Sequence, residues 1–348
     1  MIDSKAIIDF VKIAFEQDVD LNAVLIDARS PGEYAHAHIP GSLNVPLLDD
    51  TQREQVGTCY KSQGRQEAID LGFALAGPGF LEKIQAARRA AEGRPVAVYC
   101  ARGGLRSEIL TWLLNKGGLT ATQLRGGYKQ WRNACLSQFR TPRKWYVLTG
   151  LTGVGKTELL FGLKDAGEAV LDFECIAQHR GSAFGGLGMP VQPTQEQFEN
   201  ILAVHLDANS EFPHVWMEDE SRFIGKLRIP DDLYEAKINA QRIMAERSFE
   251  SRVKRVLAEY GALCKISLAE KTASLEKRMG NELMRQALTH LEQNEMETWA
   301  GILLTYYDRH YQHGIGKNSA TCIGTVSTDQ KTNTQIVQEI IALTKHGE

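Results

Sequence analysis

The chain lacks any apolar run that approaches the ~20 residues needed to cross a membrane. Its first residues, Met1 to Lys5, include an early acid and no basic segment followed by an apolar stretch, so no secretory signal is predicted. The hydrophobic share of 43% and the charged share of 24% are typical of globular proteins. We therefore expect a cytoplasmic location and no membrane partner.

Closely spaced cysteines are also missing. The six cysteines, at positions 59, 100, 135, 175, 264 and 322, form no C-x-x-C pair, which argues against a zinc site or a disulfide framework. Reduced thiols and no protein-held metal are therefore predicted. The formal net charge of −3 gives no general attraction for nucleic acid, so an RNA site would have to be a local basic patch.

The length of 348 residues exceeds one ordinary core and predicts two domains. Strand-like runs alternate with helical patterns in both halves, so the predicted fold class is α/β. We expect an N-terminal domain over residues 1–138, a short basic hinge over 139–144, and a second domain over 145–348 whose C-terminal part is helical.

The N-terminal domain places a cysteine where a strand ends. The apolar run 96–99 is followed by Cys100 and then by a predicted helix from Leu105 to Asn115, with Leu105, Ile109, Trp112 and Leu113 at helical spacing. Ligands of open α/β sheets bind at the carboxyl ends of strands. Cys100 therefore stands at a candidate site.

The residues after Cys100 suit an anion. Gly103 and Gly104 allow backbone N–H groups to turn inward, and Arg102 and Arg106 add positive charge. A thiolate is the reactive form of cysteine, and such surroundings favour it. The alternative is an inert buried cysteine, which we accept for the positions 59, 135, 175 and 264.

A complete phosphate-binding loop follows the hinge. The strand-like run 145–149 leads into G-x-x-x-x-G-K-T, and the helical pattern from Glu158 ends near Gly167. The loop glycines let amides face an anion, the lysine can reach a terminal phosphate, and the threonine can bind phosphate directly or through Mg²⁺. The predicted diphosphate-binding residues are Gly150, Gly153, Gly155, Lys156 and Thr157.

Two further groups are candidates for an acid or a ligand. A second strand-like run ends in Glu218-Asp219-Glu220, where a P-loop protein keeps a metal-binding or basic carboxylate, and we select Asp219 and Glu220. A glycine-rich segment beginning His179-Arg180 could fold over a ligand or be only a long crossover. Later arginines, among them Arg247 and Arg252, could face phosphate or lie on a solvated helix.

Several motifs of the first domain resemble the rhodanese family over roughly residues 5 to 135. They are Asp27-x-Arg29, Glu33-Tyr34, His38-Ile39-Pro40-Gly41, Asn44-x-Pro46, the Cys100 loop, and Leu124-Arg125-Gly126-Gly127-Tyr128 with Trp131. The C-x5-R spacing from Cys100 to Arg106 is similar to the phosphatase branch of that fold and implies room for a tetrahedral anion. Against a phosphatase, Tyr99 stands where a histidine usually precedes the cysteine.

Over its whole length the chain resembles the bacterial tRNA 2-selenouridine synthase family. Beside the two loops, the resemblance is carried by His179-Arg180-Gly181-Ser182-x-Phe184-Gly185, Gln192-Pro193-x-Gln195, Glu218-Asp219-Glu220-Ser221 and Tyr306-Tyr307-Asp308. It implies replacement of sulfur by selenium in the wobble 2-thiouridine of tRNAs for lysine, glutamate and glutamine.

The resemblance also implies the co-substrates. Selenophosphate is the selenium donor of that family, and geranyl diphosphate supplies a geranyl group to the thiouridine sulfur. In this interpretation the P-loop binds the diphosphate, the Cys100 loop binds selenophosphate, and no cofactor is tightly bound. Two alternatives stay open: a P-loop kinase or NTPase with a regulatory rhodanese module, and a rhodanese-type sulfurtransferase or phosphatase.

Overall fold

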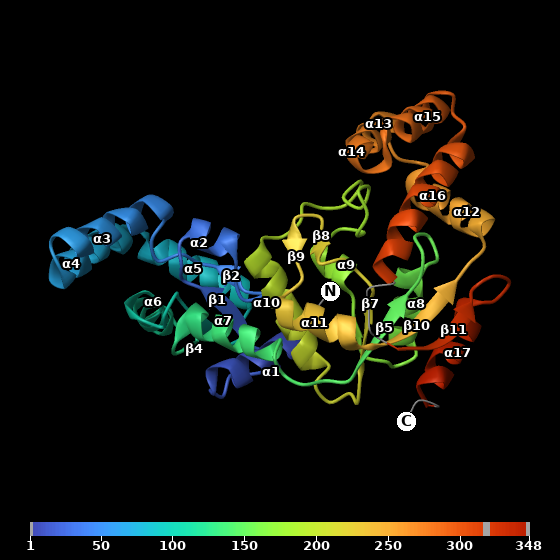
Figure 1. Ribbon diagram of the computed structural model, residues 1–348. Helices are drawn as coiled ribbons and strands as arrows, with labels where there is room; N and C mark the ends of the chain where they lie inside the picture. The colour runs from blue at the N-terminus through green and yellow to red at the C-terminus, as the bar shows by residue number, and fades with distance from the viewer. Residues whose placement is uncertain (1–2, 316–320, 346–348) are drawn as a thin grey trace. The chain divides into compact units, whose positions relative to one another are not determined.

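A computed structural model describes residues 3–315 and 321–345. It divides into two compact units (Figure 1): unit 1 comprises residues 1–141 and 194–208, and unit 2 comprises 142–193 and 209–348. Both are α/β, so the predicted fold class is confirmed. Each domain was expected to be one continuous stretch of the chain. Because residues 194–208 belong to unit 1, the chain instead passes between the units three times.

Unit 1 contains a four-stranded parallel sheet in the order β2-β1-β3-β4. Its elements are α1 (Ser4–Phe15), β1 (Val24–Asp27), α2 (Pro31–His36), β2 (Leu43–Asn44), α3 (Asp50–Ser62), α4 (Arg65–Ala76), the 3-10 turn η1 (Gly77–Gly79), α5 (Phe80–Ala91), β3 (Val96–Tyr99), α6 (Leu105–Lys116), β4 (Ala121–Gln123), α7 (Gly127–Gln138) and α10 (Gln195–Ala208). The strands β1 and β3 are buried along their whole length, as their continuous apolar runs require.

The helix α6 begins where it was predicted, and its expected buried face is correct in part. Leu113 is buried and Ile109 is half-buried, but Leu105 and Trp112 are exposed. Ser107, Leu110 and Leu114 are buried in addition. The first turn of the helix therefore directs a serine toward the sheet end that carries Cys100.

Helix α10 completes unit 1, although its sequence lies between two strands of unit 2. Its Phe198, Leu202 and Leu206 are fully buried, and it packs against α1 and α7. A buried amide fixes it, because Asn200 Nδ2 donates to Tyr128 Oη at 2.8 Å and to the carbonyl of His38 at 3.0 Å.

Unit 2 contains a five-stranded parallel sheet in the order β11-β10-β5-β7-β6 and a short antiparallel hairpin. Its elements are β5 (Trp145–Thr149), α8 (Lys156–Asp165), β6 (Val170–Leu171), α9 (Phe173–Ala177), β7 (Val215–Glu218), β8 (Phe223–Ile224), β9 (Leu227–Arg228), α11 (Asp231–Asn239), β10 (Gln241–Glu246), α12 (Phe249–Tyr260), α13 (Lys265–Ser274), α14 (Glu276–Met279), α15 (Asn281–Glu292), α16 (Met296–Ile315), β11 (Cys322–Ser327) and α17 (Asn333–Lys345).

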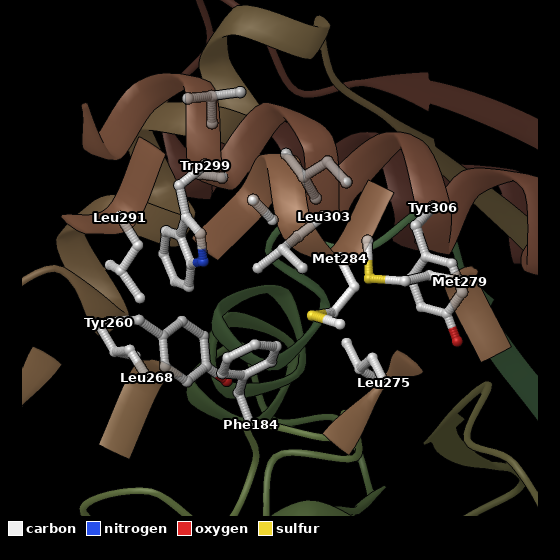
Figure 2. Packing of buried hydrophobic residues seen from close by; sticks show 14 residues of the cluster. Phe184, Tyr260, Leu268, Leu275, Met279, Met284, Leu291, Trp299, Leu303 and Tyr306 are labelled. Atoms are coloured by element: carbon white, nitrogen blue, oxygen red, sulfur yellow. The ribbon is translucent and has the colours of Figure 1, made fainter. Parts of the chain in front are cut away.

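The helices α12 to α16 pack on one another and form a second core of unit 2 (Figure 1). Figure 2 shows that Phe184, which comes from the glycine-rich segment after α9, lies among the side chains of this core. Its ring centroid is 5.8 Å from that of Trp299 and 6.1 Å from that of Tyr260. The apolar core therefore anchors the segment for which the sequence left open a ligand-covering loop or a long crossover.

No helix in the described part of the chain has both the length and the hydropathy of a membrane span.

Candidate functional sites

The Cys100 loop lies between the carboxyl end of β3 and the start of α6. Two amides of α7 hold it from outside: Tyr128 N donates to the Cys100 carbonyl at 2.8 Å, and Lys129 N donates to the Ala101 carbonyl at 3.0 Å. Glycine is required at this approach, since a Cβ on Gly127 would come within 2.3 Å of the Cys100 oxygen. The motif Gly126-Gly127 thus fixes the loop by close backbone packing.

The sulfur of Cys100 is buried and lies near two oxygens. Ser107 Oγ is 3.1 Å from Sγ, and the Gly104 carbonyl oxygen is 3.7 Å from it. Gln123, the last residue of β4, donates Nε2 to Ser107 Oγ at 2.9 Å. Neither Ser107 nor Gln123 was selected from the sequence, because only the fold brings positions 100, 107 and 123 together.

The two arginines of this loop have different surroundings. Arg102 is exposed, whereas Arg106 forms an ion pair with Glu33, with Nη1 2.5 Å from Oε2. Burial opposes ionisation of Glu33, but the hydrogen bonds and charge of Arg106 outweigh it, and the pKa of the carboxyl is lowered. Arg106 can therefore bind a second anion only by sharing or exchanging its partner.

The other rhodanese-like motifs of unit 1 have structural roles. Asp27 and Arg29 form a buried ion pair of 2.6 Å at the end of β1, and Arg29 also donates to the Ala37 carbonyl. Tyr99 Oη accepts from Ile39 N at 3.1 Å and lies 2.8 Å from Ser42 Oγ. These contacts fix the loop before β2.

The P-loop has the predicted position between β5 and α8. Gly150, Gly153 and Gly155 have φ values of +152°, +80° and +98°, which side chains other than glycine rarely adopt. Lys156 Nζ donates to the Gly150 carbonyl at 3.1 Å, and Thr157 Oγ1 donates to Glu174 Oε2 at 3.1 Å. Both functional side chains thus have contacts that an anion would have to replace.

Arg252 supports this loop from α12. The guanidinium is buried, donates to the Thr152 carbonyl at 3.2 Å, and forms a two-point pair with Asp308 of α16 at 2.9 and 2.7 Å. The Tyr306-Tyr307-Asp308 motif therefore contributes an acid that fixes an arginine at the P-loop. Arg247 bonds instead to Thr328 Oγ1 at 2.8 Å.

Carboxyl groups gather beside Thr157. Glu174 N donates to Glu218 Oε1 at 2.8 Å, and a Cβ on Gly181 would lie 2.9 Å from Glu174 and 2.4 Å from Glu220. Burial raises the pKa of Glu174 to about 8, with the nearby charge of Glu220 adding to the effect. Burial also raises the pKa of Glu218 and of Glu220. Glu220 also feels the charge of Lys156, which partly opposes the effect of burial on its pKa.

Asp219 occupies a different environment from its neighbours. Its carboxylate pairs with Lys237 at 2.7 Å and Arg242 at 2.6 Å and accepts from Thr149 Oγ1 at 2.8 Å. Burial opposes its ionisation, but these two cations outweigh burial and lower its pKa. The structure thus separates the two acids that were selected together: Glu220 faces the P-loop residues, and Asp219 is the counter-ion of two buried cations.

The side chains of His179 and Arg180 also have different contacts. The ring of His179 packs against Gly185, where a Cβ would lie 2.8 Å from Nδ1, and burial lowers the pKa of the imidazole. Arg180 donates to the Leu187 carbonyl at 3.1 Å and pairs with Glu259 at 2.8 Å. Arg180 therefore holds the glycine-rich segment on α12.

The described residues include no group of three or more His, Cys, Asp or Glu side chains arranged to hold a metal ion. Mg²⁺ at Thr157 stays a prediction. Of the cysteines assumed to be inert and buried, Cys59 and Cys135 are buried, whereas Cys175 and Cys264 are exposed.

Replacing Glu174 by glutamine should stabilise the chain at alkaline pH. The carboxyl holds a proton in the folded state up to about pH 8, so its stabilising contribution is complete below the ordinary pKa and is lost as pH rises through about 8. We expect the Glu174→Gln variant to exceed the parent in free energy of unfolding by more than about 1 kcal/mol at pH 8, and by less at pH 5.

Urea unfolding of both chains at several pH values measures this difference. Glu158→Gln is the matched control, since that carboxylate is mostly exposed and paired with Arg255. Parallel pH profiles for Glu174→Gln and the parent would contradict the assignment of the bound proton to Glu174.

Comparisons with known proteins match each of the two loop-containing regions to a known domain family. Residues 14–134 match the model of the rhodanese-like domain, and residues 143–289 match the tRNA 2-selenouridine synthase AAA domain. The chain is 35% identical over 335 residues to a tRNA 2-selenouridine synthase of Shewanella sp. (strain ANA-3), covering 86% of this chain and 90% of that protein. The tRNA 2-selenouridine synthase of Nitrosomonas europaea is 39% identical over 244 residues, covering 68% and 63%.

The fold and its two loops therefore define a rhodanese-like unit joined to a P-loop unit. The chain belongs to the tRNA 2-selenouridine synthase family. The resemblance predicted from the motifs is confirmed.

Proposed function

We propose that this chain converts the wobble 2-thiouridine of tRNA (position 34) into 2-selenouridine in two group transfers, with geranyl diphosphate and selenophosphate as co-substrates. The observation that carries the proposal is the presence of two anion loops in a member of this family, one that begins with the thiol of Cys100 and one that contains Lys156. The tRNAs would be those for lysine, glutamate and glutamine.

In the first transfer, the sulfur of 2-thiouridine bonds to C1 of the geranyl group, and the C–O bond to the diphosphate breaks. Negative charge grows on the departing pyrophosphate, where the P-loop amides, Lys156 and Thr157 would stabilise it. For this, Lys156 leaves the Gly150 carbonyl and Thr157 leaves Glu174. ATP hydrolysis is not required.

In the second transfer, the selenium of selenophosphate bonds to C2 of the base, the C2–S bond breaks and geranylthiol leaves. Hydrolysis of the Se–P bond then releases phosphate and completes 2-selenouridine. Alkylation makes this step feasible, because a thioether-like sulfur departs more readily than a thiocarbonyl sulfur. Selenophosphate would bind at the Cys100 loop through its backbone N–H groups and Arg102, with Arg106 exchanging Glu33 for the donor's phosphate. Cys100 would assist delivery of selenium.

The test is mass spectrometry of nucleosides from 2-thiouridine-containing tRNA incubated with the protein and each co-substrate, alone and together. We expect S-geranyl-2-thiouridine with geranyl diphosphate alone, and 2-selenouridine when both are present. Unchanged thiouridine with folded protein, together with rapid ATP turnover in the absence of tRNA, would favour the NTPase alternative.

A further inference from the structure

The side-chain amide of Gln123 has no part in either proposed transfer. Gln123 Nε2 donates to Ser107 Oγ at 2.9 Å and to the Gly103 carbonyl at 3.0 Å, and it lies 3.4 Å from the Gly104 carbonyl. A single amide at the end of β4 thus reaches both the Cys100 loop and the hydroxyl beside the sulfur.

We propose that Gln123 is a positioning residue of the Cys100 site, which directs the hydroxyl hydrogen of Ser107 onto the sulfur and so stabilises the thiolate. The inference rests on the proposed role of Cys100 as the reactive thiol.

The argument follows from the number of hydrogens available. The Ser107 hydroxyl carries one hydrogen and has two acceptors in reach, Cys100 Sγ at 3.1 Å and the Gly104 carbonyl at 3.0 Å. By donating to Ser107 Oγ, Gln123 fills an acceptor position of that oxygen and leaves its hydrogen to be donated elsewhere. A thiolate competes for that hydrogen better than a neutral carbonyl, because hydrogen bonds to charged groups are the stronger ones.

The charges around the loop are the same with or without Gln123. They are the pair of Glu33 on α2 with Arg106 on α6, the pair of Asp27 with Arg29 at the end of β1, Arg102 in the loop itself, and the exposed Arg125 and Lys129 of the adjoining turn and α7. A neutral substitution at position 123 therefore changes the hydrogen bonding of the site and leaves its charged groups in place.

The experiment follows the ultraviolet absorbance of the Cys100 thiolate against pH in the full-length chain. The spectrum of the matching Cys100→Ser protein is subtracted, which removes the other cysteines. Gln123→Met has a similar volume and no donor, and it is expected to move the titration midpoint upward by about one pH unit, the equivalent of one charge-assisted hydrogen bond. Ser107→Ala should move it as far, and Ser107→Thr, which keeps the hydroxyl, should restore the parent midpoint.

A double variant separates positioning from general support of the loop. If Gln123 acts through Ser107, then Gln123→Met should cause no further shift in the Ser107→Ala background. An equal shift in both backgrounds, or no shift in either, would overturn the proposal. Gln123→Leu provides a second apolar variant, and cooperative urea unfolding verifies the fold of each.

The matched control is Asn115→Ala. Asn115 is an amide that fixes the opposite end of β4, donating to the Ala121 carbonyl at 2.9 Å and accepting from Ala121 N at 3.0 Å. It is expected to leave the midpoint unchanged. The titration midpoint is measured without tRNA or selenophosphate. The proposed function is tested separately, by asking whether Cys100→Ser loses selenation, so the two proposals can fail independently.

Discussion

Lys156→Ala should abolish transfer of the geranyl group, lowering its rate by at least about 10²–10³-fold, the usual cost of removing one donor from a site where charge develops. Lys156 is the P-loop side chain whose ammonium can follow the diphosphate as it leaves, and its Nζ donates to the Gly150 carbonyl at 3.1 Å. S-geranyl nucleoside, measured by mass spectrometry with geranyl diphosphate alone, reports the loss.

Two variants complete that experiment. Lys164→Ala removes an exposed lysine near the end of the same helix, α8, and should retain full geranylation. Cys100→Ser should retain geranylation and lose selenation, because the sulfur belongs to the second transfer. Geranylation retained by Lys156→Ala would end the assignment of the P-loop to the diphosphate.

The second large effect concerns stability. Asp219→Asn should lower the free energy of unfolding by about 3–5 kcal/mol, because it leaves the charges of Lys237 and Arg242 buried without a counter-ion. The lowered pKa of Asp219 gives the same contribution a pH dependence: it is complete above the ordinary carboxyl pKa and is lost as pH falls through the folded-state value.

Urea unfolding at neutral pH measures this loss. Asp231→Asn is the control, since Asp231 also pairs with two arginines, Arg222 and Arg228, but lies in solvent, and it should show no clear change. If Asp219→Asn unfolded at the urea concentration of the parent, the ion cluster would not be a support of unit 2.

The sequence predicted the elements whose signals are local. The strands before Cys100 and before the P-loop, the glycines of the P-loop, and the helix start at Leu105 all follow from short motifs that dictate backbone conformation. The helix after the P-loop begins at Lys156, two residues before the expected Glu158. The sequence could not show that Asp219 and Glu220, which follow β7, lie in different environments. A strand alternates its side chains between two faces, but which face holds the cations depends on Lys237 and Arg242, which come from α11 and β10.

The residues that sequence analysis missed are those with ordinary local patterns. Glu174 follows a capping aspartate at the start of a five-residue helix, and only the fold places it against Thr157. The expected apolar positions of α6 did not include Ser107, which the fold places beside Cys100. Gln123 stands at the end of a three-residue strand that carries no functional motif.

The position of α10 governs how the chain can be synthesised and divided. A ribosome makes residues 142–193 of unit 2 before it makes the helix that covers α1 and α7, so unit 1 cannot finish folding when its own sheet is complete. A fragment cut after residue 141 would expose the apolar surface that Phe198, Leu202 and Leu206 cover. Unit 1 is therefore complete only after part of unit 2 has been synthesised.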